Sequence, residues 1–215
     1  DQEEILNASD NQGAARLAYL RGSRAQENLL FRERPPGLLG DIVHSGVTFV
    51  SGTGPALSGP NFPNHAAYRA TNRERPPVVY VGANDGMLHA FNATTGRELF
   101  GYVPGAVFAN LPALSAMNFQ HRYFVDSTPM VGDVQRTNNS WATYLVGGLG
   151  AGGKGYYALD VSTQSTFATA SETSLASALP MWEFSDAQDT DLGYTFNEPS
   201  INPVNGAYRQ ITKMA

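Results

Sequence analysis

The chain has 215 residues, of which 42% are hydrophobic and only 15% are charged, a composition that predicts a packed core and excludes a disordered tail. The formal net charge is −5 and no cluster of Lys or Arg stands out, so the basic surface of a nucleic-acid-binding protein is absent. The lack of cysteine excludes a disulfide framework and a cysteine-based zinc site. No run approaches the roughly 18 apolar residues of a membrane helix.

The first 30 residues read as helical, with interruptions at Gly13 and Gly22. We therefore expect a helical lead-in over residues 1–35, before the sequence changes near Gly40 to short strands and turns. The chain starts at Asp1 with neither Met nor a signal peptide. This start leaves open two origins, a targeting segment already removed or an excised piece.

The clearest strand pattern lies in residues 78–100. Residues 78–83 are β-branched and aromatic, which favours a strand. The following Asn-Asp-Gly sequence at residues 84–86 suits positive φ and closes a tight hairpin. A return strand over residues 87–91, a Thr-Thr-Gly turn and a strand over residues 97–103 complete a three-stranded meander.

The same pattern returns in residues 143–161 as strand, glycine-rich turn and strand, with a closing strand around residues 181–184. A shorter element precedes each unit and centres on Gly46, Pro129 and Pro199, at intervals of 83 and 70 residues. We expect these three residues at equivalent positions in successive antiparallel sheets.

Propeller repeats usually run about 40–50 residues. The excess here lies in three insertions, residues 51–77, 104–122 and 162–180. We expect all three to be surface loops. Within the first insertion, prolines on both sides of residues 64–74 predict a short helix.

Tandem four-stranded units indicate propeller blades, and a single blade cannot bury both of its faces alone. The predicted fold class is therefore all-β, a partial propeller over residues 36–215. It comprises two full blades, residues 36–104 and 123–186, and the start of a third, residues 191–215. Because a closed ring needs about four to eight blades, we expect an incomplete ring that is part of a larger propeller.

The unit in residues 79–100 resembles the repeat of quinoprotein-type propellers, with its Asp-Gly and Thr-Gly turns and aromatic closing strand. Longer motifs, spanning roughly residues 15–200, resemble the PilY/PilC family of type IV pilus biogenesis and adhesion proteins. These motifs are RLAYLRGSRAQE, LLGDIVHSGVTFV, VVYVGANDGMLHAFNATTGRELFGYVPGAVFANLPAL, HRYFVDSTPMVGDV, YLVGGLGAGGKGYYALDV and WEFSDAQDTDLGYTF.

The resemblance implies a non-enzymatic domain that supports pilus assembly against retraction, surface adhesion and twitching motility. It implies a secreted or periplasmic protein at the outer membrane and pilus tip. The implied partners are pilin and minor pilin subunits and a host surface receptor, with membrane association only through the full-length protein. The family's calcium is bound by a loop expected beyond Ala215, so that site transfers to no residue here. Residues 205–215 depart from the family's next strand.

Two segments invite a ligand-binding interpretation, and each has a simpler alternative. Asp186, Asp189 and Asp191 could hold calcium, but their spacing is not that of an EF-hand, and a solvated turn is the alternative. Residues 147–155 are rich in glycine, yet no helix follows Lys154, so a hairpin is favoured over a phosphate loop.

The remaining polar candidates indicate no catalytic site. The histidines lack helical metal spacing, and His89 is expected to be a packed or edge side chain; they are His44, His65, His89 and His121. Ser127 has no nucleophile-elbow motif and no local base. Asp41, Asp126 and Asp133 flank expected strand ends and are assigned to capping, and Trp141 and Trp182 to blade packing.

Two alternative functions share the blade repeat. A quinone-cofactor dehydrogenase would need a stacking Trp, an adjacent-cysteine disulfide and a calcium–carboxylate centre, and the disulfide is excluded because the chain has no cysteine. An outer-membrane assembly scaffold would lack the GDIVHSG and HRYFVDSTP motifs. The sequence therefore favours the pilus factor, with no catalytic, cofactor or metal residues assigned.

Overall fold

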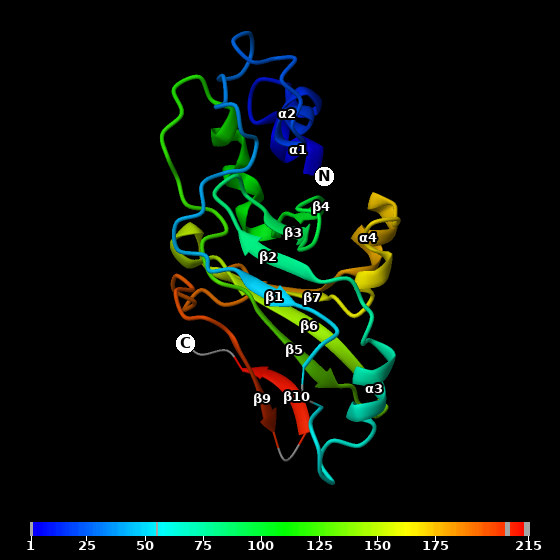
Figure 1. Ribbon diagram of the computed structural model, residues 1–215. Helices are drawn as coiled ribbons and strands as arrows, with labels where there is room; N and C mark the ends of the chain where they lie inside the picture. The colour runs from blue at the N-terminus through cyan, green and yellow to red at the C-terminus, as the bar shows by residue number, and fades with distance from the viewer. Residues whose placement is uncertain (1, 55, 205–206, 213–215) are drawn as a thin grey trace.

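The structure, a computed structural model, describes the backbone of residues 2–54, 56–204 and 207–212 and the side chains of residues 4–54 and 56–201. Within these residues the strands form three antiparallel sheets (Figure 1). The first has the order β1 (Thr48–Val50), β2 (Val78–Gly82), β3 (Leu88–Asn92), β4 (Glu98–Tyr102). The second has the order β5 (Met130–Gln135), β6 (Trp141–Gly148), β7 (Gly155–Asp160), β8 (Pro180–Ser185). The third pairs β9 (Ser200–Val204) with β10 (Ala207–Thr212).

The blade prediction is confirmed. Gly46 lies just before β1, and Pro129 and Pro199 immediately precede β5 and β9, so all three lead into the first strand of an antiparallel sheet. The described strands do not close a ring. No helix in the described parts of the chain is both long and apolar enough to cross a bilayer.

Local turn chemistry sets the register of the first blade. Gly86 adopts a φ of 95° and Gly96 a φ of 71°, both in the left-handed region that glycine favours. At the first turn the Asp85 carboxylate accepts the backbone N–H of Met87 at 3.2 Å. At the second, the side chain of Asn92 accepts two backbone N–H groups. These turns place β2, β3 and β4 in sequential antiparallel pairs.

The main core fills the space between the first and second blades. Tyr80 of the first blade and Tyr157 of the second are fully buried. The rings of Phe100 and Phe167 meet edge to face at 5.3 Å between centroids. Such packing buries large apolar areas and gains further from ring geometry. The blades are thus stacked by aromatic side chains from both sheets.

Glu183, on β8, links the second blade to the first at the side of this core. Its carboxylate accepts the backbone N–H of Gly105 at 2.9 Å and the hydroxyl of Tyr102. Burial and the Glu183 carboxylate both raise the pKa of Tyr102. The phenol therefore stays protonated and donates to the carboxylate.

The N-terminal segment is helical over a shorter range than expected. α1 (Gln2–Asn7) and α2 (Gly13–Leu20) contact the 3-10 helix η1 (Gly105–Ser115), and Arg16 donates to the Ser115 hydroxyl at 2.9 Å. The expected helix over residues 21–30 is wrong, because Gly22 turns the chain out of the helix with a φ of 102°. The division into a lead-in of residues 1–35 and a propeller part stays a prediction.

The insertions are more ordered than simple surface loops. The helix predicted within residues 64–74 is confirmed as α3 (His65–Thr71). In the second insertion, η1 buries Val107, Leu111 and Leu114, so the surface-loop prediction is wrong there. The third insertion carries η3 (Gln164–Thr166) and α4 (Glu172–Ala178), and α4 stands away from the sheets (Figure 1).

Gly82 gives a direct test of how the second blade's lead-in segment meets the first blade. A Cβ at Gly82 would overlap the carbonyl oxygen of Val125, whereas a Cβ at Gly37 would meet nothing within 4 Å. We expect Gly82→Ala to lower the free energy of unfolding by about 1–3 kcal/mol, because the backbone must shift. Urea denaturation measures this change, and Gly37→Ala is the matched control. Equal stability of the two variants would contradict the proposed close packing.

Candidate functional site

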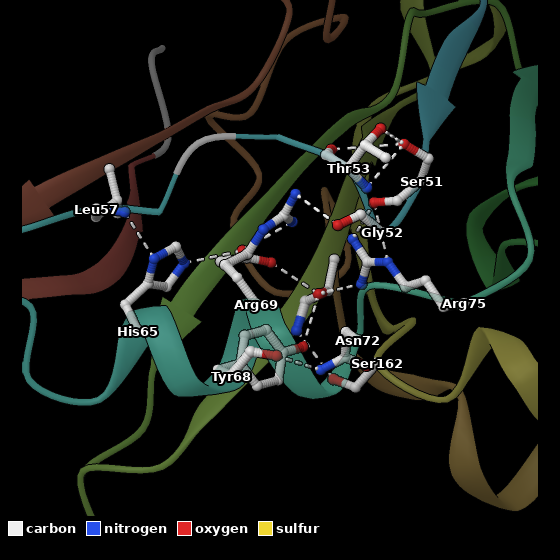
Figure 2. Close-up of polar contacts among 12 residues, drawn as sticks. Ser51, Gly52, Thr53, Leu57, His65, Tyr68, Arg69, Asn72, Arg75 and Ser162 are labelled. Atoms are coloured by element: carbon white, nitrogen blue, oxygen red, sulfur yellow. Dashed lines mark hydrogen bonds and ion pairs between the residues drawn. The ribbon is translucent and has the colours of Figure 1, made fainter.

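The first insertion is anchored on the second blade by a buried polar network (Figure 2). α3 presents His65, Tyr68 and Arg69 toward β5 and β6. Just before the helix, the carbonyl of Pro63 accepts the indole N–H of Trp141 at 2.7 Å. The helix therefore sits over the start of β6 rather than projecting into solvent.

Asp133 is the centre of this network. It stands opposite Thr143 in the β5–β6 register, and its Oδ1 accepts the Thr143 hydroxyl at 2.8 Å. Its Oδ2 lies 3.0 Å from Nε2 of His65 and 3.4 Å from Nη1 of Arg69. Sequence analysis assigned Asp133 to capping at a strand end, which is wrong. The residue lies inside β5, and its carboxylate joins two elements distant in sequence.

His65 has a tautomer that its neighbours determine. Its Nδ1 accepts the backbone N–H of Leu57 at 2.8 Å, so the ring proton resides on Nε2 and is donated to Asp133. The ring is buried and packs edge-on against Trp141, with centroids 4.4 Å apart. The neutral imidazole thus has both nitrogens satisfied, as a buried polar group requires.

Arg75 closes the insertion at its other end. Its guanidinium donates to the carbonyl of Ser51 at 3.0 and 3.1 Å and to the Thr143 hydroxyl at 2.9 Å. Thr143 also accepts the hydroxyl of Tyr68 at 2.8 Å, and burial raises the pKa of Tyr68. Both ends of the insertion are therefore bonded to each other and to the second blade. The arrangement positions a loop, and sequence reasoning missed it because its members come from four separate segments.

A second polar cluster lies where the lead-in segments of the two blades meet. Asp126 is buried and accepts both the backbone N–H of His44 at 3.1 Å and a proton shared with His44 Nδ1 at 2.6 Å. Asp41 bonds to Asn84 at 3.0 Å and to His121 at 2.8 Å. These carboxylates join different segments, so the local capping expected for Asp41 and Asp126 is wrong as the main role.

His89 lies buried on β3 between two carboxylates, which confirms that it is a packed side chain. Its Nδ1 is 2.6 Å from Glu98 and its Nε2 is 3.1 Å from Asp85. Burial alone would lower the pKa of His89, but hydrogen bonds to Asp85 and Glu98 outweigh it and raise the pKa to about 9. The imidazolium therefore joins the hairpin turn to β4 at neutral pH.

Comparison with known proteins identifies the family. A family model described as the PilY1 beta-propeller domain matches residues 39–214. The chain belongs to the PilY1 β-propeller domain family. The match includes residues 205–214, which sequence analysis had set apart as a departure from the family.

Several PilY1 proteins are similar over most of the chain. A type IV pilus biogenesis factor PilY1 from Pseudomonas aeruginosa UCBPP-PA14 is 40% identical over 205 residues, covering 91% of this chain and 16% of that protein. A PilY1 homolog from Xylella fastidiosa Temecula1 is 40% identical over 195 residues, covering 87% of this chain and 15% of that protein. The chain therefore spans about a sixth of these relatives.

One solved structure has the same fold. The crystal structure of the Pseudomonas aeruginosa PilY1 C-terminal domain aligns with a TM-score of 0.53 at 33% identity. The alignment covers 74% of this chain and 30% of the crystallised one. The PilY1 β-propeller fold expected from the blade repeats is thereby confirmed.

The aspartates that raised the question of calcium lie in an exposed turn. The side chain of Asp189 accepts the backbone N–H of Asp191 at 3.1 Å, and Asp186 lies 4.0 Å from the Lys154 ammonium. Throughout the described residues, no three acidic or histidine side chains gather in a way that could hold a metal ion. These donors therefore do not fit the calcium that the PilY/PilC resemblance implies.

The other sequence candidates have structural positions. Residues 147–155 connect β6 to β7 as a hairpin, with η2 (Gly150–Gly152) at its centre. Ser127 is buried, and among the described residues its hydroxyl has no hydrogen-bond partner. Trp141 is buried, and Trp182 is half-buried on β8. None of these residues joins the network around Asp133 except Trp141, through His65.

His65→Phe tests the anchor of the first insertion. The change keeps a ring of similar size but leaves the Leu57 N–H unpaired and removes one donor to Asp133. We expect the free energy of unfolding to fall by about 1–3 kcal/mol. His121→Phe is the control, since the side chain of His121 is 45% exposed and its bond to Asp41 should contribute little. Equal losses in urea denaturation would show that the buried network is not special.

His89 makes stability depend on pH. Its pKa of about 9 in the folded protein exceeds the ordinary value of 6.5, so its contribution is full below pH 6.5 and is lost as pH rises through 9. We expect His89→Gln to lower the free energy of unfolding by roughly 2–3 kcal/mol at pH 6 and by much less at pH 9.5. Denaturation across this range measures the difference, and a difference independent of pH would refute the ion-pair role.

Proposed function

We propose that the protein is a non-enzymatic factor in type IV pilus biogenesis that works outside the cytoplasm, at the cell surface or pilus tip. The observation that carries this proposal is the family match over residues 39–214, together with relatives named type IV pilus biogenesis factor PilY1. Because the chain spans about a sixth of those relatives, their activity as whole proteins is extended to it as part of the proposal.

The geometry supports a scaffold. The polar side chains that sequence analysis singled out are used to join segments: His65 and Asp133 anchor an insertion, and His44 and Asp126 join two lead-in segments. Two stacked blades held by aromatic packing and such cross-links form a rigid support. Rigid supports with exposed insertions are suited to docking other proteins.

The third insertion offers the most accessible contact surface. In α4 every side chain is exposed except that of Leu175, which is half-buried against the core. The first insertion, in contrast, is bonded to the second blade through α3. We therefore assign α4 to contacts with pilin or minor pilin subunits, and a host surface receptor is a further partner. These contacts would stabilise extending pili against retraction and so support adhesion and twitching motility.

Charge placed on α4 tests this surface. Thr173 and Ser177 lie one turn apart and are both exposed. We expect Thr173→Lys with Ser177→Lys to reduce surface pili several-fold, because desolvating two ammonium groups opposes a protein contact. Pili are counted by electron microscopy in cells that make the full-length protein. Thr94→Lys, on an exposed turn of the first blade, is the matched control and should leave piliation unchanged.

A genetic comparison tests the role in retraction. Deleting the propeller domain from the full-length protein should abolish surface pili, and should do so less in a strain that also lacks the retraction motor. Normal piliation and twitching after the deletion would end the proposal. Normal piliation with lost attachment would restrict the role to adhesion.

A further inference from the structure

A hollow beside the anchored insertion has the composition of a small binding site. Its volume is about 340 Å³, at the lower end of the range for small-molecule pockets. It lies between the first insertion, β5 and β9, and its lining includes Leu57, Arg69, Met130, Val131, Gly132 and Ile201. The lining is thus largely apolar, with one guanidinium.

Arg69 has donors to spare. Of its five N–H groups, Nη1 reaches Asp133 at 3.4 Å and Nη2 reaches the Gly52 carbonyl at 3.3 Å, both longer than the usual 2.9 Å. Its Nε is buried and has no partner among the described residues. The side chain is only 14% exposed, so bulk water replaces few of these bonds. A cation in this position is incompletely satisfied.

The charges around the hollow leave a positive excess. Arg69 and Arg75 are both largely buried, and among the described residues Asp133 is the one carboxylate that bonds to the network they share. His65 is neutral in this geometry, because its Nδ1 accepts a hydrogen bond. Arg75 is satisfied at all three nitrogens by neutral oxygens. The unmatched positive charge therefore resides at Arg69.

We propose that this hollow binds a carboxylate carried on a short aliphatic group. A guanidinium presents paired N–H groups that match the two oxygens of a carboxylate. The aliphatic part would lie against Leu57, Met130 and Val131, which line the same hollow. This binding site goes beyond the proposed role in pilus biogenesis and does not depend on it.

A singly charged carboxylate fits better than a phosphate. Asp133 lines the hollow as well, and its negative charge opposes a second negative charge nearby. Arg75 cannot add a second cation to the ligand, since its donors are already used and it is buried. The ligand is thus limited to one negative charge and an apolar tail.

Titration of the purified protein with hexanoate, followed by NMR or calorimetry, tests the site. We expect saturable binding of hexanoate, with hexanamide and inorganic phosphate binding at least about tenfold more weakly, since each lacks either the charge or the tail. Arg69→Met should weaken hexanoate binding by about tenfold or more. Arg73→Met, in the same insertion with a side chain 78% exposed, is the control and should bind as the unaltered protein does.

Leu57→Trp provides a second variant, which fills the hollow and leaves Arg69 in place, and it should also abolish binding. Circular dichroism melting establishes that each variant is folded, and the Leu57 variant decides the question if the Arg69 variant is not. The proposal is overturned if hexanoate does not bind, if hexanamide binds equally well, or if folded Arg69→Met and Leu57→Trp proteins bind as tightly as Arg73→Met.

Discussion

The stacking of one blade on the next is the interaction on which the rest of the structure depends. Each four-stranded sheet has two faces to bury, and the first and second blades cover each other through Tyr80, Phe100 and Tyr157. Large aromatic side chains supply most of the apolar area that such a contact removes from water. The polar networks follow from this packing, because it brings strands 50 or more residues apart in sequence within hydrogen-bonding distance, as with Thr143 and Tyr68.

The polar contacts in turn decide where the insertions lie. An insertion between β1 and β2 belongs to the first blade by sequence, yet His65 and Arg75 bond to residues of the second. Glu183 does the reverse from the second blade, reaching Tyr102 and Gly105 of the first. Because buried donors and acceptors are costly to leave unpaired, each insertion is held in one position only while its neighbouring blade is present. Loop position and blade stacking are therefore one cooperative property.

The sequence predicted what is local and missed what is distant. Turns such as Asp85-Gly86 and the proline-bracketed α3 depend on neighbouring residues, so the strands and that helix could be located beforehand. The helix end at Leu20 was missed because Gly22 was treated as an interruption rather than a stop. Asp133 and His65 are 68 residues apart, and no periodicity connects them. Their pairing requires the tertiary fold, which explains why the anchor could not be predicted and the blades could.

The third sheet shows why the hollow forms where it does. Gly132 on β5 has no side chain, and a Cβ there would lie 3.1 Å from the side chain of Ile201 at the start of β9. This lets the third sheet approach the second closely, while the first insertion closes over the same strand through Arg69. The hollow is thus bounded by parts of three successive units. A group bound there would contact all three at once, and because it would bind the stacked arrangement alone, its binding free energy would add to the stability of the stack.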